Sequence, residues 1–219
     1  MCSSPTRAPS REAPRRGLRR WAFAHLLASA ASADRRLYGP RKVALLGALR
    51  GTVVELGAGA GPNAVYLAPG TRWVAVEPNV HFHGRLRQAA RQHGLTLTLS
   101  AAVAERLPLA DASADAVVST LVLCSVDDVP AALAEVRRVL RPGGRFVFIE
   151  HVAAPRGTML RAAQRLLRGP WSVLADGCRP DQDTLGAIRA AGFADVQAEA
   201  FSVPLGLVRP HVAGVALAP

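Results

Sequence analysis

The sequence has few of the residues that build disulfide frameworks or metal clusters. Its three cysteines are Cys2, Cys124 and Cys178, and no two of them form a Cys-x-x-Cys pair. Because an odd, scattered set provides no disulfide framework, we expect the protein to work in a reducing compartment. The six histidines are also dispersed and show no ligand spacing relative to cysteine or carboxylate. We therefore predict no metal site.

The sequence also lacks a long apolar run and is poor in aromatic residues. Residues 21–33 form an apolar, alanine-rich stretch of thirteen residues, which is shorter than the roughly 20 residues that span a bilayer as a helix. Aromatic residues make up 5% of the chain, and the arginine-rich first 33 residues contain only Trp21 and Phe23. Without a series of rings on which bases could stack, we expect no nucleic-acid partner.

The positive charge is concentrated near the N-terminus. Of the net charge of +11, residues 1–50 carry +9 and residues 51–219 carry +2. We expect residues 1–20, which are rich in proline and arginine, to be disordered. For the helix expected at residues 21–33, three interpretations are open: a helix that covers the ligand pocket of a cytoplasmic protein, peripheral membrane contact through residues 1–33, or an organelle transit peptide. We favour the covering helix, with membrane contact as the second alternative.

From residue 51 onward, strand and helix patterns alternate. Such alternation predicts an α/β fold with a doubly wound, mainly parallel sheet of seven strands. We divide the chain into a basic arm with a short helix at residues 1–34 and one domain at residues 35–219. The expected strands cover residues 53–56, 73–76, 95–99, 114–122, 145–149, 196–201 and 212–217, and the expected helices cover residues 61–67, 79–92, 128–140, 156–168 and 181–191.

Residues 53–61 (VVELGAGAG) join a short apolar run to three alternating glycines. Gly57, Gly59 and Gly61 allow a sharp turn after a strand and a close approach of the backbone to a ligand. Glu77 ends the next apolar run, twenty residues after the first glycine. At the tip of the neighbouring strand, its carboxylate could accept hydrogen bonds from two ribose hydroxyls. These features predict a nucleoside-binding site.

Pro62 distinguishes between two kinds of nucleoside. A dinucleotide fingerprint needs a third small residue at this position, where a helix packs closely on the strand. The spacing Gly-x-Gly-x-Gly followed by Pro62 instead resembles motif I of the class I S-adenosylmethionine-dependent methyltransferases. This resemblance implies a Rossmann-like fold and S-adenosylmethionine as the methyl donor.

Further motifs strengthen the resemblance and narrow it. Residues 115–126 resemble the fourth-strand motif of the class, and residues 135–150 resemble its helix–turn–strand unit around Pro-Gly-Gly. The narrower resemblance is to the methyltransferase-like thiol S-methyltransferases, which carry a methyltransferase type 11 domain, and it covers about residues 35–217. It depends on residues 120–126 (TLVLCSV), 150–154 (EHVAA), 176–178 (DGC) and 208–211 (VRPH).

The sequence departs from this pattern in two places. Vertebrate members of the group begin with a longer and more hydrophobic membrane anchor than residues 21–33. Many class I enzymes also have an aspartate where this chain has Val103, so adenine recognition would depend on the backbone of residues 103–105 and on apolar packing. The resemblance assigns donor binding to Glu55, Gly57, Gly59, Gly61, Glu77, Pro78, Val103, Ala104, Glu105, Thr120 and Leu121.

A thiol acceptor must react as the thiolate, so a base or a positive environment is needed near the strand ends. His151 is our first candidate for a catalytic base and Asp176 the second, while His211 could assist. We interpret Cys124 and Cys178 as small buried residues, because methyl transfer needs no covalent enzyme intermediate. Three residues of the segment 155–178 could line an apolar acceptor pocket or lid, or pack in the core: Leu167, Trp171 and Leu174.

Together these features predict an S-adenosylmethionine-dependent methyltransferase that acts on a small apolar acceptor, by resemblance a thiol. Two alternatives remain open. The enzyme could methylate a nitrogen, oxygen or carbon centre of a lipid or quinone, because the fold does not determine the acceptor. The chain could also be a non-catalytic, donor-binding partner protein.

Overall fold

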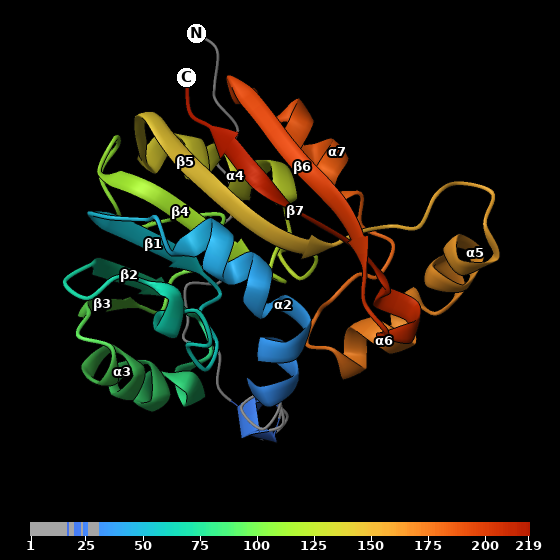
Figure 1. Ribbon diagram of the computed structural model, residues 1–219. Coiled ribbons are helices and arrows are strands. Elements are labelled where there is room, and N and C mark those ends of the chain that lie inside the picture. Colours follow the sequence, from blue (N-terminus) through green and yellow to red (C-terminus); the bar gives the residue numbers. More distant parts are fainter. Residues whose placement is uncertain (1–16, 18–19, 23, 26–30) are drawn as a thin grey trace, which may run out of the picture.

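The computed structural model describes residues 17, 20–22, 24–25 and 31–219 (Figure 1). The disorder expected for residues 1–20 concerns a segment that lies almost entirely outside these ranges. Residues 20–22 and 24–25 are helical. The helix α2 (Ala31–Leu46) runs without a break across residues 34 and 35, where we placed the boundary between the basic arm and the domain. In the described ranges, no helix has both the length and the apolar character that crossing a membrane requires.

A seven-stranded sheet forms the centre of the molecule, in the order β3-β2-β1-β4-β5-β7-β6. The first five strands of this order are parallel to one another, and β7 runs antiparallel to both β5 and β6. The prediction of a doubly wound, mainly parallel sheet is therefore confirmed. The strands are β1 (Thr52–Leu56), β2 (Arg72–Val76), β3 (Thr96–Ser100), β4 (Ala114–Thr120), β5 (Leu140–His151), β6 (Asp195–Ser202) and β7 (Pro210–Leu217).

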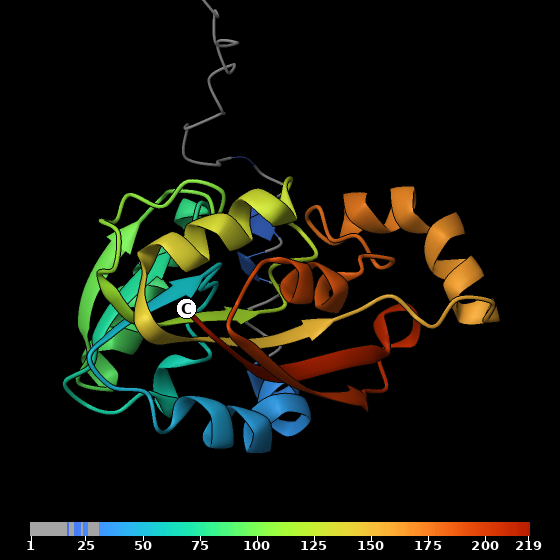
Figure 2. The same ribbon diagram turned by 90° about the horizontal axis from the view of Figure 1, so that it is seen from above.

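Helices cover both faces of the sheet, as Figure 2 shows for α2 and α4 (Val129–Val139) on opposite sides. Successive strand residues point to opposite faces, so each strand contributes to two apolar layers. Val54 of β1 packs in one layer with α4 and with α7 (Thr184–Ala190). Its neighbour Val53 packs in the other layer with α2 and with α3 (His83–Gln92).

Helix α4 shows how the sequence determines an element. Asp128 caps its N-terminus by accepting a hydrogen bond from the backbone N–H of Ala131, and Pro130 occupies the first turn, where a missing N–H costs little. The apolar residues recur every three or four positions and are all buried: Val129, Ala132, Leu133, Val136 and Val139. The prediction of a helix at residues 128–140 is therefore confirmed to within one residue at each end.

Three helical segments differ from expectation. The helix predicted at residues 61–67 is only the 3-10 helix η1 (Ala64–Tyr66), because positive φ angles up to Gly61 and the extended Leu67 leave no room for an α-helix. Residues 156–168 form α5 (Met159–Leu166), and a further helix, α6 (Arg168–Leu174), follows it. We did not predict α2 beyond residue 33, because arginines and Lys42 obscure its apolar pattern.

Lys42 explains how such a polar helix packs against the sheet. Its side chain is fully buried, and its Nζ lies 2.7 and 2.8 Å from the two carboxylate oxygens of Asp34. A buried ammonium is tolerated when it is paired in this way, so a charged residue occupies a position where an apolar residue would normally indicate the buried face.

Candidate active site

A cavity of about 920 Å³ opens at the carboxyl ends of β1, β2, β4 and β5. In open α/β sheets, ligands bind at this edge, and the volume lies within the range of small-molecule sites. Every residue to which the sequence assigned donor binding lines it, and so do the two candidate bases, His151 and Asp176. The structure thus brings together strand-end residues that lie far apart in the chain.

The glycine loop follows β1 directly. Gly57, Gly59 and Gly61 all have positive φ angles, of 54°, 53° and 81°. At Gly57 a Cβ atom would lie 2.7 Å from the side chain of Val122, a separation that side chains do not tolerate. The loop therefore needs glycine here both for its backbone conformation and for its close approach to the segment after β4.

Glu77 lies at the end of β2 and is held by the glycine loop. Its Oε2 accepts a hydrogen bond from the backbone N–H of Gly59 and its Oε1 from that of Asn79, both at 2.8 Å. The side chain is 6% exposed, and burial raises the pKa of its carboxyl above the ordinary value, against the effect of these two hydrogen bonds. Each oxygen keeps a further lone pair with which it can accept a ligand hydroxyl.

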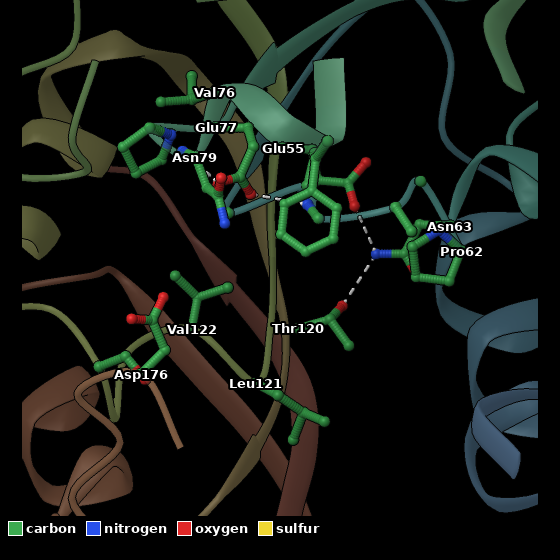
Figure 3. A pocket seen from close by; sticks show the side chains of 18 of the residues that line it. Glu55, Pro62, Asn63, Val76, Glu77, Asn79, Thr120, Leu121, Val122 and Asp176 are labelled. Carbon is green, nitrogen blue, oxygen red and sulfur yellow. Dashed lines mark hydrogen bonds between the residues drawn. The ribbon is translucent and has the colours of Figure 1, made fainter. Parts of the chain in front are cut away.

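Glu55 is the last but one residue of β1 and is fully desolvated. It accepts hydrogen bonds from Asn63 Nδ2 at 2.8 Å and from Trp73 Nε1 at 2.7 Å, and Asn63 also donates to Thr120 Oγ1 at 3.1 Å (Figure 3). Burial raises the pKa of Glu55 to about 7. The Oδ1 atom of Asn63 is buried without a hydrogen-bond partner. Sequence reasoning missed Asn63, although its position directly after Pro62 in the loop was a usable signal.

Residues 103–105, the predicted adenine-binding segment, also line the cavity. Val103 accepts a hydrogen bond from the backbone N–H of Arg106 at 3.2 Å, which closes a turn. The side chain of Glu105 accepts from the backbone N–H groups of Asp127 at 2.7 Å and Asp128 at 3.3 Å, before α4. Its carboxylate therefore ties this turn to the start of α4, and the turn presents mainly its backbone and apolar side chains to the cavity.

Glu150 shapes the segment that follows β4. Its buried carboxylate accepts from Ser119 Oγ at 2.6 Å and from the backbone N–H of Val122 at 3.1 and 3.2 Å. Burial raises its pKa to about 7. These bonds hold Leu121 in a turn with a positive φ angle of 59°, which places Leu121 and Thr120 on the wall of the cavity.

His151, the first candidate base, ends β5 and is 3% exposed. Its Nε2 lies 3.0 Å from the sulfur of Cys178, and Trp171 Nε1 donates to the same sulfur at 3.2 Å. The Nδ1 atom of His151 is buried without a hydrogen-bond partner. His151, Trp171, Cys178 and Cys124 all line the cavity.

The two cysteines are buried, as expected, but they are not chemically equivalent. Hydrogen bonds from Cys124, His151 and Trp171 lower the pKa of Cys178 to about 5, although its burial acts in the opposite direction. The hydrogen bond to Cys178, followed by burial, raises the pKa of Cys124 well above its ordinary value. The ligating atoms of Cys124, His151 and Cys178 lie within 4.8 Å of one another. Sequence spacing gave no sign of this cluster.

Asp176, the second candidate, lies across the cavity from the glycine loop (Figure 3) and has a positive φ angle of 48°. Its Oδ2 forms an ion pair with Arg20 Nη1 at 3.1 Å. The backbone carbonyl of Arg20 also accepts a hydrogen bond from Asn79 Nδ2 at 3.2 Å. Arg20 therefore connects both sides of the cavity opening, and no pattern in the sequence indicated this.

The structure corrects three minor expectations. His211 does not line the cavity, and its Nε2 instead lies 2.9 Å from the hydroxyl of Tyr38. Burial lowers the pKa of His211 to about 4. Leu167 and Leu174 are 44% and 80% exposed, and neither lines the cavity nor packs in the core. Of the three residues proposed for the acceptor pocket, Trp171 alone contributes to it, because the other two lie on the outer surface of α5–α6.

Comparison with known proteins agrees with this geometry. The family profile described as a methyltransferase domain matches residues 54–148. Thiol S-methyltransferase TMT1A of Homo sapiens is 39% identical over 171 residues, 76% of this chain and 70% of the relative. Thiol S-methyltransferase TMT1B of Rattus norvegicus is also 39% identical over 171 residues, with the same shares. A solved S-adenosylmethionine-dependent methyltransferase of Thermotoga maritima, described as a possible histamine N-methyltransferase, is 24% identical and covers 92% of this chain and 99% of its own, with a TM-score of 0.64.

Fold, cavity and family profile define an S-adenosylmethionine-dependent methyltransferase of class I, an enzyme whose class implies S-adenosylmethionine as the methyl donor. Within this class, the chain belongs to the family of the thiol S-methyltransferases TMT1A and TMT1B. The resemblance to the thiol S-methyltransferase group is thereby confirmed.

Proposed function

We propose that this methyltransferase transfers the methyl group of S-adenosylmethionine to the thiol of a small apolar acceptor. The observation that carries the proposal is the division of one cavity into two chemically different ends. The glycine loop and Glu77 form one end, and His151 and Cys178 form the other. The names of the TMT1 relatives support a thiol as the acceptor.

The residues of the donor end fit S-adenosylmethionine. The glycine loop leaves room where a Cβ at Gly57 would meet Val122, and the free lone pairs of Glu77 suit the two ribose hydroxyls. The ammonium group of the donor needs buried acceptors, which the Glu55 carboxylate and the unpartnered Oδ1 of Asn63 supply. The bound donor would supply a methyl group on a sulfonium, which is already activated for transfer.

The remaining predicted contacts complete the donor end. The backbone of the 103–105 turn would recognise the adenine, while Pro78, Thr120 and Leu121 would pack against the nucleoside and its methionine chain. All of them line the cavity, and this supports the assignment.

At the acceptor end, His151 is the group that takes the proton. If Nε2–H points to the Cys178 sulfur, the buried Nδ1 carries a lone pair and has no other partner. Nδ1 accepts the proton of the acceptor thiol, and the thiolate sulfur attacks the methyl carbon in line with the departing donor sulfur. One S–C bond forms and one breaks, which gives a thioether, S-adenosylhomocysteine and a proton that leaves to solvent. Positioning and exclusion of water supply most of the rate.

Asp176 would act at the opening of this end, where its ion pair with Arg20 limits access of water to the acceptor. This arrangement supports the covering role that we proposed for the N-terminal segment. If His151 is not the base, Asp176 is the remaining acidic group at this end that could take the thiol proton.

The decisive experiment measures donor turnover with alkyl thiols, amines, phenols and quinones under identical conditions. We expect methylation of thiols only, and replacement His151→Gln should lower turnover by about 10²–10⁴-fold while donor affinity stays within about twofold. Turnover of a quinone or amine instead would favour the alternative acceptor classes. Donor binding without turnover of any acceptor would favour a non-catalytic partner protein.

We further propose that the protein is cytoplasmic and contacts anionic membrane surfaces through residues 1–33. The support is the concentration of +9 net charge in residues 1–50. Basic segments are attracted to anionic lipid surfaces without any membrane-spanning helix.

A further inference from the structure

Two side chains from separate segments converge on the sulfur of Cys178. Trp171 Nε1 of α6 donates at 3.2 Å, and His151 Nε2 at the end of β5 lies at 3.0 Å. An indole N–H can only donate, so the sulfur is an acceptor in this contact. A thiol could donate to His151 Nε2, but this would leave a proton on the buried Nδ1 without an acceptor, whereas a thiolate accepts from both the indole and the imidazole.

We propose that Cys178 is a thiolate that positions His151 for catalysis. The thiolate accepts the Nε2–H of His151 and thereby fixes the neutral ring in the tautomer that carries its lone pair on Nδ1. It does for His151 what a buried carboxylate does for the histidine of a hydrolase triad. The inference rests on the proposed function, because it assigns the second partner of the proposed base.

Burial makes the tautomer assignment consequential. His151 is 3% exposed and Cys178 is 8% exposed, so each residue depends mainly on protein groups for its hydrogen bonds. Without the thiolate, the ring would be free to place its proton on Nδ1, and that tautomer presents an N–H to the acceptor thiol. The ring would then be unable to take the proton. Cys178 therefore acts through His151 and needs no contact with the acceptor.

The two carboxylates next to this cluster in sequence have hydrogen-bond or ion-pair partners of their own. The carboxylate of Glu150, next to His151 in sequence, is directed to Ser119 and Val122 on the donor side. Asp176, next but one to Cys178, forms an ion pair with Arg20. The sulfur of Cys178 has the imidazole of His151 and the indole of Trp171 as its hydrogen-bond partners.

Cys124, His151 and Cys178 could in principle hold a soft metal ion, but the geometry favours the hydrogen-bonded thiolate. Two ligands of one tetrahedral zinc ion lie about 3.5 Å apart, given Zn–N and Zn–S bonds of about 2.0 and 2.3 Å. The nitrogen of His151 and the sulfur of Cys178 are only 3.0 Å apart, a hydrogen-bond distance. The experiment must nevertheless be able to detect a bound metal ion.

The test is a double-mutant cycle between His151→Gln and Cys178→Ala, with kcat and KM for an alkyl thiol and the Kd of the donor as readouts. We expect Cys178→Ala to lower kcat by roughly 10- to 100-fold, less than the loss of the base itself, with donor Kd unchanged within about twofold. The double variant should be no slower than His151→Gln alone within about threefold, because Cys178 acts only through His151. Additive losses would overturn the proposal.

Two further variants separate positioning from packing. Cys178→Asp places an anionic acceptor near the same position and should recover kcat relative to Cys178→Ala, whereas Cys178→Ser, of similar size but neutral, should not. Trp171→Phe keeps the ring and removes one donor, so it should have a smaller effect than Cys178→Ala. Equal activity of the Ser and wild-type proteins would mean that Cys178 only fills space.

A measurement on the wild-type protein needs no folded variant and no acceptor. At pH 7, alkylation of Cys178, identified by mass spectrometry, should remove a thiolate absorbance in the ultraviolet. The proposal is overturned if alkylation removes no thiolate absorbance. It is also overturned if the purified protein holds stoichiometric zinc, and if removal of this zinc abolishes both the activity and the thiolate absorbance measured without the methyl donor. If the wild-type protein methylates no thiol but this signal is present, it is the proposed function that fails.

Discussion

A hydrogen bond of 2.8 Å joins the backbone N–H of Gly59, in the loop after β1, to the carboxylate of Glu77, at the end of β2. The bond crosses between two neighbouring strand ends and is formed entirely by groups of the protein. The carboxylate is therefore already held in place at the glycine loop, so its ordering need not be part of the free-energy cost of binding the donor.

Replacement Glu77→Ala should weaken S-adenosylmethionine binding by about 1.5–3 kcal/mol, the range for hydrogen bonds to a charged group. The loss has two sources, because the ribose hydroxyls lose their acceptor and the N–H of Gly59 loses its partner. Titration calorimetry measures the affinity directly. Glu199→Ala is the matched control, since that side chain is 69% exposed and lies outside the cavity. Unchanged affinity of Glu77→Ala would show that Glu77 does not hold the ribose.

The contribution of Glu55 to protein stability should decrease as pH rises from about 4.5 to about 7. Burial raises the pKa of Glu55 from 4.5 to about 7, so in this window the folded protein retains a proton that the unfolded chain releases. The associated change in the free energy of unfolding is up to about 3 kcal/mol. Denaturant unfolding at pH 5 and pH 8 measures it.

Glu55→Gln removes this proton linkage. Any cost of the substitution that does not depend on pH is the same at both pH values and cancels in the comparison. The stability of the variant relative to wild type should therefore improve between pH 5 and pH 8. The control variant Glu199→Gln, at an exposed position, should have nearly the same stability as wild type at both pH values. A constant difference between Glu55→Gln and wild type would contradict the assignment.

Donor binding should also depend on pH through Glu55. If the carboxylate pairs with the ammonium of the donor, binding favours the ionised form, and below pH 7 a proton must be released on binding. Affinity should then fall as pH is lowered from 8 to 6, and calorimetry in buffers of different ionisation enthalpy should detect the released proton. In Glu55→Gln both effects should disappear. Proton release that persists in the variant would point to another group.

Two glycines provide a matched test of the loop. Gly57→Ala should destabilise the protein by at least about 1–2 kcal/mol, because its φ angle is 54° and the new Cβ would lie 2.7 Å from Val122. Gly84→Ala in α3 meets no atom within 4 Å and should stabilise the protein by about 0.4–1 kcal/mol. Thermal unfolding and donor affinity measure both variants. Equal effects would show that the loop tolerates a side chain.

Binding to anionic vesicles should depend on the N-terminal segment and weaken with salt. Each arginine near an anionic surface contributes about 1 kcal/mol, and the contribution is screened within a Debye length. Removal of residues 1–16 leaves Arg20 and its ion pair in place, so the cavity should keep its donor affinity while vesicle binding decreases. Co-sedimentation at low and high salt measures the effect. Vesicle binding that is unchanged by both the deletion and salt would place the contact on the folded domain.

Much of the fold was predictable because strand and helix periodicities were undisturbed in the region from residue 51 onward. The donor end was predictable for a related reason. Parallel strands place their carboxyl ends at one edge, so motifs such as the glycine loop and Glu77 must meet there once the strand order is known. Helix α2 was missed because the buried face contains a paired Lys42, a polar residue where periodicity analysis expects an apolar one.

Contacts between distant loops were not predictable. His151 and Cys178 are 27 residues apart, and Arg20 and Asp176 are 156 residues apart. Such separations carry no periodic signal, because the intervening chain can return by many routes. The hydrogen bonds that distinguish Cys178 from an ordinary buried cysteine therefore became visible only in the folded chain.

Strand β5 has one consequence for how this enzyme can vary between relatives. Glu150 and His151 are consecutive residues whose side chains point to opposite faces of the strand, one to the turn at the donor end and the other to the sulfur cluster. Insertion or deletion of a single residue in β5 would exchange the two faces and disable both ends at once. Sequence change in this family should therefore preserve the length of β5 strictly.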